Sequence, residues 1–382
     1  MYMWPFWSIP SYIISLATAA LIFLYSIINH NAYDFSVKRL WLVLLLLCVA
    51  AYNGTAEAGF SRVLGTLVNF VPVIFLLVLS ADKQNDVLKS VSKWFAWLLV
   101  PGMILFILRL IVNFPSVGSL YFSETQYGEF LNYIFYIKDN YSGDIPRFNG
   151  PFIEPGHLGM ICSLFLFANK FDFKRKSVWI ILAASLISLS LAAYVLMFIG
   201  VVLIYARDLR KLIALAFVLI AAVFIIGKVW NGGDNIVSKL IFSRLKYDEE
   251  KIISGNNRSL YQTDYYYEEF RKEGALRYGI GAERFNEMME NKQIGGAGYK
   301  MYVLPYGYAG VFLIALFYFM TAWFAPDRKY GLSFFVLIVA AFQPQEYVLW
   351  MAWLLPYITA TGSSGLITND EKNEEYGSDA SL

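Results

Sequence analysis

The sequence predicts an all-α, polytopic membrane helix bundle, and three observations support this. Hydrophobic residues make up 58% of the 382 positions and charged residues only 16%, whereas a soluble domain carries about 25% charged residues. Apolar runs recur along the chain at lengths that suit bilayer-spanning helices. Lys and Arg are concentrated in short segments between alternate runs, as in the cytoplasmic loops of membrane proteins.

The apolar runs predict about eleven spans, within a range of roughly ten to twelve, because about 20 residues cross a bilayer core. The expected spans are 9–29, 40–53, 63–80, 94–113, 155–169, 177–190, 191–206, 212–229, 301–324, 331–343 and 346–361. The run 177–206 is too long for one helix, and we expect two short helices that meet near Ser188 and Ser190. The sequence Gln343-Pro-Gln345-Glu346 predicts a polar turn between the last two spans.

Positive charge predicts which loops face the cytoplasm. The basic loops contain Lys38 and Arg39; Lys83, Lys89 and Lys93; Lys170, Lys174, Arg175 and Lys176; Arg207, Arg210 and Lys211; and Arg328 and Lys329. These basic loops alternate with loops that are poor in Lys and Arg, such as 53–62, and two long segments, 114–150 and 230–300, then remain on the outer side. We expect one membrane domain over residues 1–366, followed by an acidic, disordered cytoplasmic tail over 367–382.

The outer segment 230–300 is long enough to form a small subdomain. A helix is expected over 259–273, because Ser254-Gly-Asn-Asn257 supplies good N-cap residues and Leu260, Tyr267 and Phe270 fall on one helical face. A second short helix is expected over 283–291. A glycine-rich run, 295–298, then leads into the next span.

The segment 147–159 carries the strongest functional signal in the chain. Arg147, Glu154 and His157 lie within eleven positions where a polar loop meets an apolar span. Ionisable groups near lipid are costly, so such a cluster is a candidate site. Pro155 suits the first turn of a helix, and a helix start attracts anions. The alternative is structural: an interfacial arginine, a carboxylate favoured by the helix dipole, and a hydrogen-bonded histidine.

Arginines in the second outer segment are further candidates. Arg258 lies at the expected start of the 259–273 helix, where a guanidinium and a helix N-terminus together would suit a diphosphate. Arg277 and Arg284 flank Tyr278-Gly-Ile-Gly281, a weak match to a phosphate-binding turn. The alternative for these arginines is a solvated surface or an ion pair with a nearby glutamate.

Several kinds of chemistry lack support in the sequence. No Asp-x-Asp pair is present, and two His and two Cys residues do not suggest a metal site. We therefore expect no metal and no cofactor. A net charge of +2 gives no reason to expect a nucleic-acid partner.

Four features of the sequence occur together: the motif Arg147-x-x-Gly-x-x-x-Glu154-Pro-x-x-x-Gly159, two short spans with a Ser-containing turn, an arginine near the start of a large-loop helix, and Tyr306-Gly-Tyr-Ala-Gly310. In this arrangement the chain resembles the bacterial O-antigen polymerase/ligase superfamily, which includes the Wzy-type polymerases. The resemblance covers about 60–360, and its motifs are short and degenerate. It implies a metal-independent lipid-carrier glycosyltransferase of the bacterial inner membrane, with its active site facing the periplasm.

The resemblance also implies substrates and residue roles. Donor and acceptor would be glycans linked to undecaprenyl diphosphate, with membrane lipid as surroundings and a chain-length regulator as a further partner. Arg147 and Arg258 would bind the diphosphate and Glu154 would be the acid/base, with His157 beside it. Apart from the resemblance, the residues themselves make Arg277, Arg284, Tyr261 and Tyr265 further substrate-binding candidates, the tyrosines by stacking on sugar rings.

Polymerisation of O-antigen or capsular repeats is the function that we expect, and two rivals remain. Ligases of this superfamily usually carry a functional histidine in the large outer loop, whereas 230–300 has none. This favours a polymerase over a ligase that transfers glycan to lipid A-core. A lipid-linked glycan flippase or transporter would need a charge-lined path through the membrane, and few charges lie inside the apolar runs.

Overall fold

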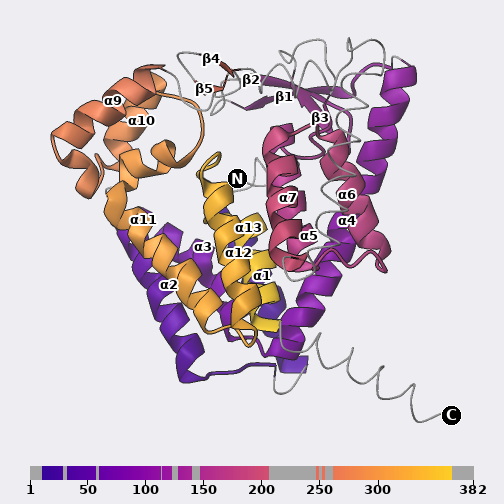
Figure 1. The fold of residues 1–382 in the computed structure, drawn as a ribbon, viewed down its shortest axis with the longest axis horizontal. Helices are drawn as coiled ribbons and strands as arrows, with labels where there is room; N and C mark the ends of the chain where they lie inside the picture. The colour runs from indigo at the N-terminus through magenta and orange to yellow at the C-terminus, as the bar shows by residue number, and fades with distance from the viewer. Residues whose placement is uncertain are drawn as a thin grey trace. The chain divides into compact units, whose positions relative to one another are not determined.

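The computed structural model describes residues 11–28, 32–56, 60–112, 114–122, 128–139, 147–205, 247–248, 252–253 and 261–363. These residues are mostly helical (Figure 1). The helices are α1 (Ser11–Ile28), α2 (Val37–Ala56), α3 (Phe60–Val78), α4 (Ala81–Ile111), α5 (Pro155–Ala168), α6 (Lys176–Ile187), α7 (Leu191–Tyr205), α9 (Tyr261–Lys272), α10 (Ala282–Glu290), α11 (Tyr299–Trp323), α12 (Arg328–Phe342) and α13 (Met351–Ser363). The expected span 212–229 and the expected tail 367–382 lie outside the described residues.

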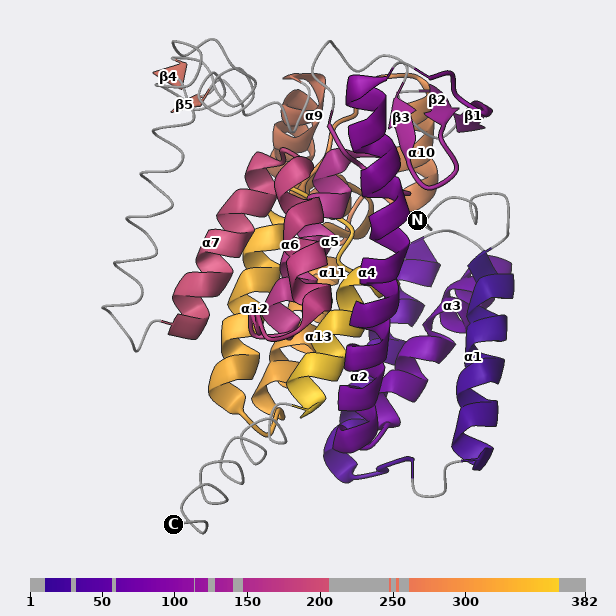
Figure 2. The same ribbon diagram turned by 90° about the vertical axis from the view of Figure 1, so that its right-hand side faces the viewer.

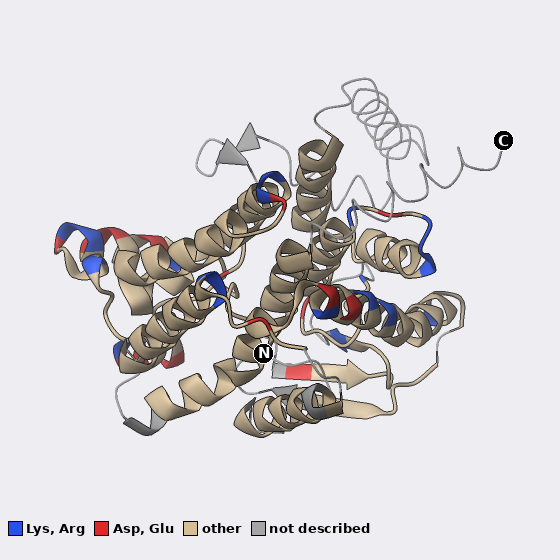
Figure 3. Ribbon diagram, turned by 90° about the horizontal axis from the view of Figure 1, so that it is seen from below, with Lys and Arg blue, Asp and Glu red and all other residues tan. Residues whose placement is uncertain are grey.

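Three of these helices, α2, α4 and α11, are long and apolar enough to cross a membrane. Several others are apolar but shorter, including α5 with 14 residues and α6 with 12. Figure 3 shows Lys, Arg, Asp and Glu concentrated at helix ends and in α9 and α10, whereas most helix shafts carry none. The described chain is thus a helical membrane protein, as its composition predicted.

Within the predicted domain 1–366, the chain divides into two compact units. Unit 1 contains 90–257 and unit 2 contains 8–89 and 258–382, with the first seven residues grouped with unit 1. In unit 1, α5 packs against α6 and α7 (Figure 2). Every residue of α5 from Gly156 to Ala168 is buried, as expected for a helix that is apolar on all sides. This helix is therefore the centre of unit 1.

The all-α prediction was wrong for part of the outer segment 114–150. Strands β1 (Gly118–Phe122), β2 (Gly128–Asn132) and β3 (Ile137–Asp139) form an antiparallel sheet in the order β1-β2-β3. Leu120 pairs with Phe130 across β1 and β2, and these two side chains join Ile137 and Ile153 in one apolar cluster. The strands are short, and their apolar side chains pack against Ile153, which lies outside the sheet. The local sequence pattern therefore did not predict them. A second pair, β4 (Tyr247–Asp248) and β5 (Ile252–Ile253), has two residues per strand.

In unit 2, α3 packs against α1, α2 and α13, and α11 packs against α2 and α12. A buried hydrogen bond joins α11 to α2, from the Tyr302 hydroxyl to Asn53 Oδ1 at 2.9 Å. Helix α12 ends at Phe342 and α13 begins at Met351, which confirms the polar turn predicted at 343–346. The helices predicted over 259–273 and 283–291 are also confirmed as α9 and α10, and a short 3-10 helix, Ala275–Arg277, lies between them.

Helix α11 is broken near its N-terminal end. Pro305 lies inside it, and Gly307 has φ 65° and ψ −178°, a conformation that is essentially restricted to glycine. The freed backbone groups find partners in the loop before α10, because the Ile280 and Gly281 amides donate to the Leu304 and Pro305 carbonyls at 2.8 and 3.3 Å. Tyr52 of α2 holds both segments, since its hydroxyl donates to the Tyr278 and Tyr306 carbonyls.

The break predicts a strong effect of Gly307→Ala on stability. A Cβ at position 307 would collide with the backbone of Tyr278 and Gly279, and the conformation itself would cost roughly 1–3 kcal/mol. We expect the thermal unfolding midpoint of the purified protein to fall by several degrees. Gly65→Ala in α3 is the matched control, because its Cβ would meet nothing within 4 Å. Equal midpoints for the two variants would contradict this account of the break.

Candidate functional site

The predicted cluster lies at the N-terminal end of α5, in unit 1, and a buried segment leads into it. Phe148, Asn149 and Ile153 are almost completely buried. The Asn149 amide donates to the Phe152 and Ile153 carbonyls at 2.8 and 3.3 Å, and the Ile137 amide of β3 donates to Gly150 O at 3.0 Å. The backbone between Arg147 and Glu154 is therefore held in one path, which places these two residues relative to α5.

Glu154 is the N-cap of α5, and Pro155 is its first residue, as predicted. The Glu154 side chain makes no capping hydrogen bond. Its Oε2 instead lies 3.8 Å from His157 Nε2, at ion-pair distance. The His157 side chain is 5% exposed and the Glu154 side chain 26%, so the imidazole lies inside the protein and the carboxylate reaches its surface. Carboxylate and imidazole thus form a pair at the positive end of a helix dipole.

The turn between α6 and α7 forms the next wall of the site. Ser188 and Ser190 are buried there, which confirms the predicted junction of two short helices. Gly159 of α5 approaches this turn so closely that a Cβ would lie 2.7 Å from the Ala193 Cβ and 2.8 Å from the Ser188 Oγ. Gly156 faces the same region, since its Cβ would lie 3.9 Å from Glu154 Oε2 and 4.0 Å from Ser190 Oγ. The glycines of the motif therefore let α5 pack tightly against small residues.

Arg147 is joined to the same turn. Its Nε donates to the Ser188 carbonyl at 3.2 Å, and Ser188 is the C-cap of α6. A cation at a helix C-terminus is favoured by the helix dipole. Arg147 also interacts electrostatically with the Tyr194 hydroxyl of α7. The structure thus brings Arg147, Glu154 and His157 to the end of one three-helix group, through contacts with the α6–α7 turn and the start of α5.

Arg109 is a residue that the sequence analysis missed. It lies in the last turn of α4, with its guanidinium 4.7 Å from the centre of the Tyr133 ring. Tyr133 stacks on Tyr136 at 4.7 Å, and Tyr136 packs against Phe148, the residue after Arg147. Burial raises the pKa of Tyr136 to about 12, against the attraction of Arg109. The signal in the sequence that could have identified Arg109 is a cation near the end of a strongly apolar run.

The candidates of the second outer segment lie in unit 2, apart from Arg258, which is outside the described residues. Tyr261 and Tyr265 lie on α9 and are exposed at 85% and 56%. Arg277 is exposed, with its guanidinium 5.7 Å from the Tyr278 ring centre. The Tyr278-Gly-Ile-Gly281 turn packs against the break in α11, where a Cβ at Gly279 would collide with the Pro305 carbonyl oxygen, so the structure gives Gly279 a packing role.

Arg284 lines a cavity of about 340 Å³ between α9 and α10. Its guanidinium lies 4.9 Å from the Phe270 ring centre. Three carboxylates, those of Glu269, Glu273 and Glu287, line the same cavity. One cation among three carboxylates gives an environment that disfavours a diphosphate, so Arg147 is the better-placed arginine for that role.

Metal-binding groups and similarity to known proteins also bear on this site. Across the residues that the structure describes, His, Cys, Asp and Glu form no group of three or more that could hold a metal ion. No protein-family model, curated protein or solved structure matches the chain.

Proposed function

We propose that the protein is a membrane glycosyltransferase that polymerises oligosaccharide repeats linked to undecaprenyl diphosphate, to make O-antigen or capsular polysaccharide at the periplasmic face of the bacterial inner membrane. The observation that carries the proposal is the Glu154–His157 pair at the start of α5, with Arg147 bound to the α6–α7 turn that packs against this helix. A base, a positioned imidazole, a helix N-terminus and a cation on the adjoining turn are groups that suit the displacement of a diphosphate. The sequence resemblance supplies the substrate class.

The proposed reaction is a direct displacement at the anomeric carbon of the donor. A hydroxyl oxygen of the acceptor sugar forms a bond to that carbon, and its proton passes to the Glu154 carboxylate. The bond between the anomeric carbon and the diphosphate oxygen breaks, and undecaprenyl diphosphate leaves with the electron pair. Arg147 and the α5 N-terminus stabilise the charge of the leaving group. Each arginine–phosphate hydrogen bond contributes roughly 1.5–3 kcal/mol.

His157 has a positioning role in this scheme. Its side chain is almost completely buried, so it contacts the substrate less readily than Glu154 does. Its Nε2 lies next to the carboxylate and restricts where Glu154 Oε2 points. Exposed tyrosines, among them Tyr261 and Tyr265, would stack on sugar rings of the growing chain.

The choice of polymerase over ligase is tested by the products that accumulate in a deletion strain. We expect loss of the gene to leave single repeats on lipid A-core, or single lipid-linked repeats if the polymer is capsular. Gel analysis of lipopolysaccharide and mass spectrometry of extracted lipid-linked glycans measure this. Complementation with the wild-type chain is the control. Long polymer stranded on undecaprenyl diphosphate, together with a bare core, would identify a ligase instead.

A further inference from the structure

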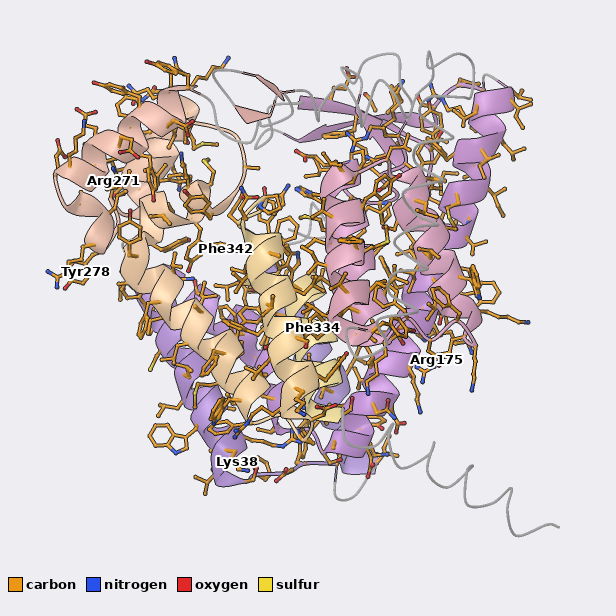
Figure 4. The ribbon with its side chains drawn as sticks, in the orientation of Figure 1. Lys38, Arg175, Arg271, Tyr278, Phe334 and Phe342 are labelled. Atoms are coloured by element: carbon orange, nitrogen blue, oxygen red, sulfur yellow. The ribbon has the colours of Figure 1, made fainter. Side chains whose placement is uncertain are left out.

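Unit 2 contains a cavity of about 510 Å³ at the end opposite the break in α11. Its lining comes from the start of α2, the end of α3, the start of α4, the turn between α11 and α12, and the end of α13. The volume falls in the range of small-molecule sites, roughly 300–1,000 Å³. Three of the basic segments that the sequence assigned to the cytoplasm, at Lys38, Lys83 and Arg328, belong to these same helix ends. Figure 4 labels Lys38 at the lower end of α2.

The cavity has a charged side that begins at the start of α2. Lys38 lines it and is exposed to solvent. Arg39 is fixed beside it, because its Nε pairs with Asp34 at 2.8 Å and its Nη1 donates to the Leu77 and Leu79 carbonyls. These bonds occupy the Arg39 side chain and compensate its charge with that of Asp34. Lys38 is thus the cation in the lining that can meet an anionic ligand.

The rest of the lining is mainly apolar, with Val37, Leu42, Leu77, Phe324 and Ile358 as its large side chains. A cation at one side and aliphatic and aromatic groups at the other match the two ends of an amphiphile. Two exposed tryptophans on the same helices, Trp41 and Trp323, are typical of the membrane interface. The Arg328 guanidinium lies 3.7 Å from the Trp323 ring centre.

A buried amide forms one wall of the cavity. Gln84 is 1% exposed and lines the cavity. Its Nε2 donates to the Leu76 carbonyl at 2.7 Å, but its Oε1 accepts no hydrogen bond from the described residues. Buried acceptors normally have a partner. This oxygen is covered by Gly362 of α13, so Gln84 fixes the wall between α4 and α13 and leaves the contact with an anionic ligand to Lys38.

We propose that this cavity binds one anionic glycerophospholipid of the cytoplasmic leaflet. The lipid phosphate would pair with Lys38, and its acyl chain would lie against Val37, Leu42 and Ile358. Basic pockets between membrane helices on the cytoplasmic side are suited to acidic headgroups. This inference does not depend on the proposed glycosyltransferase activity.

Lipid titration of the purified full-length protein tests the inference. The probes are dioleoylphosphatidylglycerol and dioleoylphosphatidylcholine in mixed detergent micelles. We expect native mass spectrometry to show one retained phosphatidylglycerol and a thermal unfolding midpoint that rises by a few degrees with this lipid alone. Lys38→Glu should weaken retention about tenfold or more, the loss expected for one charge-assisted contact.

Lys174→Glu is the matched control, because Lys174 is also an exposed lysine of a predicted cytoplasmic turn but lies in unit 1. It should leave retention unchanged. Equal retention of the two lipids, or equal losses in the two variants, would overturn the proposal. The same stabilisation by glycerol 3-phosphate alone would also overturn it, since that result would assign the site to a free phosphate. If Lys38→Glu does not accumulate, Lys38→Gln and Lys174→Gln give the same comparison.

Discussion

Replacement of Glu154 by Gln is expected to reduce the rate of polymer formation by about 100-fold or more. The amide keeps the size of the side chain but cannot accept the proton of the acceptor hydroxyl. The amide can still hydrogen-bond to His157, and no capping hydrogen bond of α5 is lost, so we expect the unfolding midpoint to change much less than the rate. The rate is measured with purified protein and lipid-linked repeats, by following polymer length on gels.

Glu283→Gln is the control for this change. Glu283 also lies in the first turn of a helix, α10, and is exposed, so its replacement should preserve the rate. His157→Gln separates positioning from catalysis: we expect a smaller loss than for Glu154→Gln, and no additional loss in the double variant, because the two side chains act as a unit. A near-normal rate for Glu154→Gln would make Glu154 a structural helix-start residue.

Replacement of Arg147 by Ala is expected to abolish polymer while the protein still inserts in the membrane. The substitution removes the guanidinium that would bind the diphosphate. Arg147→Lys should restore little activity, because an ammonium group lacks the planar fork that binds two phosphate oxygens. The measurement is the polymer ladder of complemented deletion strains at matched protein levels.

Arg147 also has a structural contact, so stability and activity must be separated. Its Nε donates to the Ser188 carbonyl at the end of α6, and a lysine could keep the favourable charge at that helix end. We therefore expect Arg147→Lys to unfold near the wild-type midpoint and still lack polymer. Arg175→Ala is the control, since Arg175 binds Asn169 and Asp172 without a proposed role in the reaction. Normal ladders from Arg147→Ala would contradict the assignment.

The sequence predicted helices best where composition alone decides the structure. Long apolar runs correspond to α2, α4 and α11. Ser188 and Ser190 marked the junction of α6 and α7, because small polar residues can interrupt an apolar helix through local interactions alone. Glu154 and Pro155 were placed correctly at the start of α5, because a proline at the first helical position is also a local signal. Local chemistry is sufficient for such features.

Features that depend on distant contacts could not be predicted in this way. The strands at 118–139 exist because Leu120, Phe130 and Ile137 pack on Ile153, and no local pattern shows that contact. The Gly279 and Gly281 pair resembled a phosphate-binding turn, yet both residues lie against the break in α11. The surroundings of Arg109 likewise could not be predicted, because its contacts are with Tyr133 and Tyr136, which come from the segment between β2 and β3.

The length of α5 has a consequence for how the protein senses its bilayer. Its 14 residues rise only about 21 Å, whereas the hydrocarbon core is about 30 Å thick. If the basic turn after α5 lies at the cytoplasmic headgroups, Glu154 and His157 lie several ångströms below the opposite headgroups. A lipid-linked diphosphate would then have to sink, or the membrane would have to thin around unit 1. The helices that pack around α5 are also short, since α6 has 12 residues and α7 has 15, and they carry exposed apolar side chains such as Trp179 and Phe198. Acyl-chain length would therefore tune the reaction through hydrophobic mismatch at α6 and α7, so that membrane thickness itself would become a determinant of turnover.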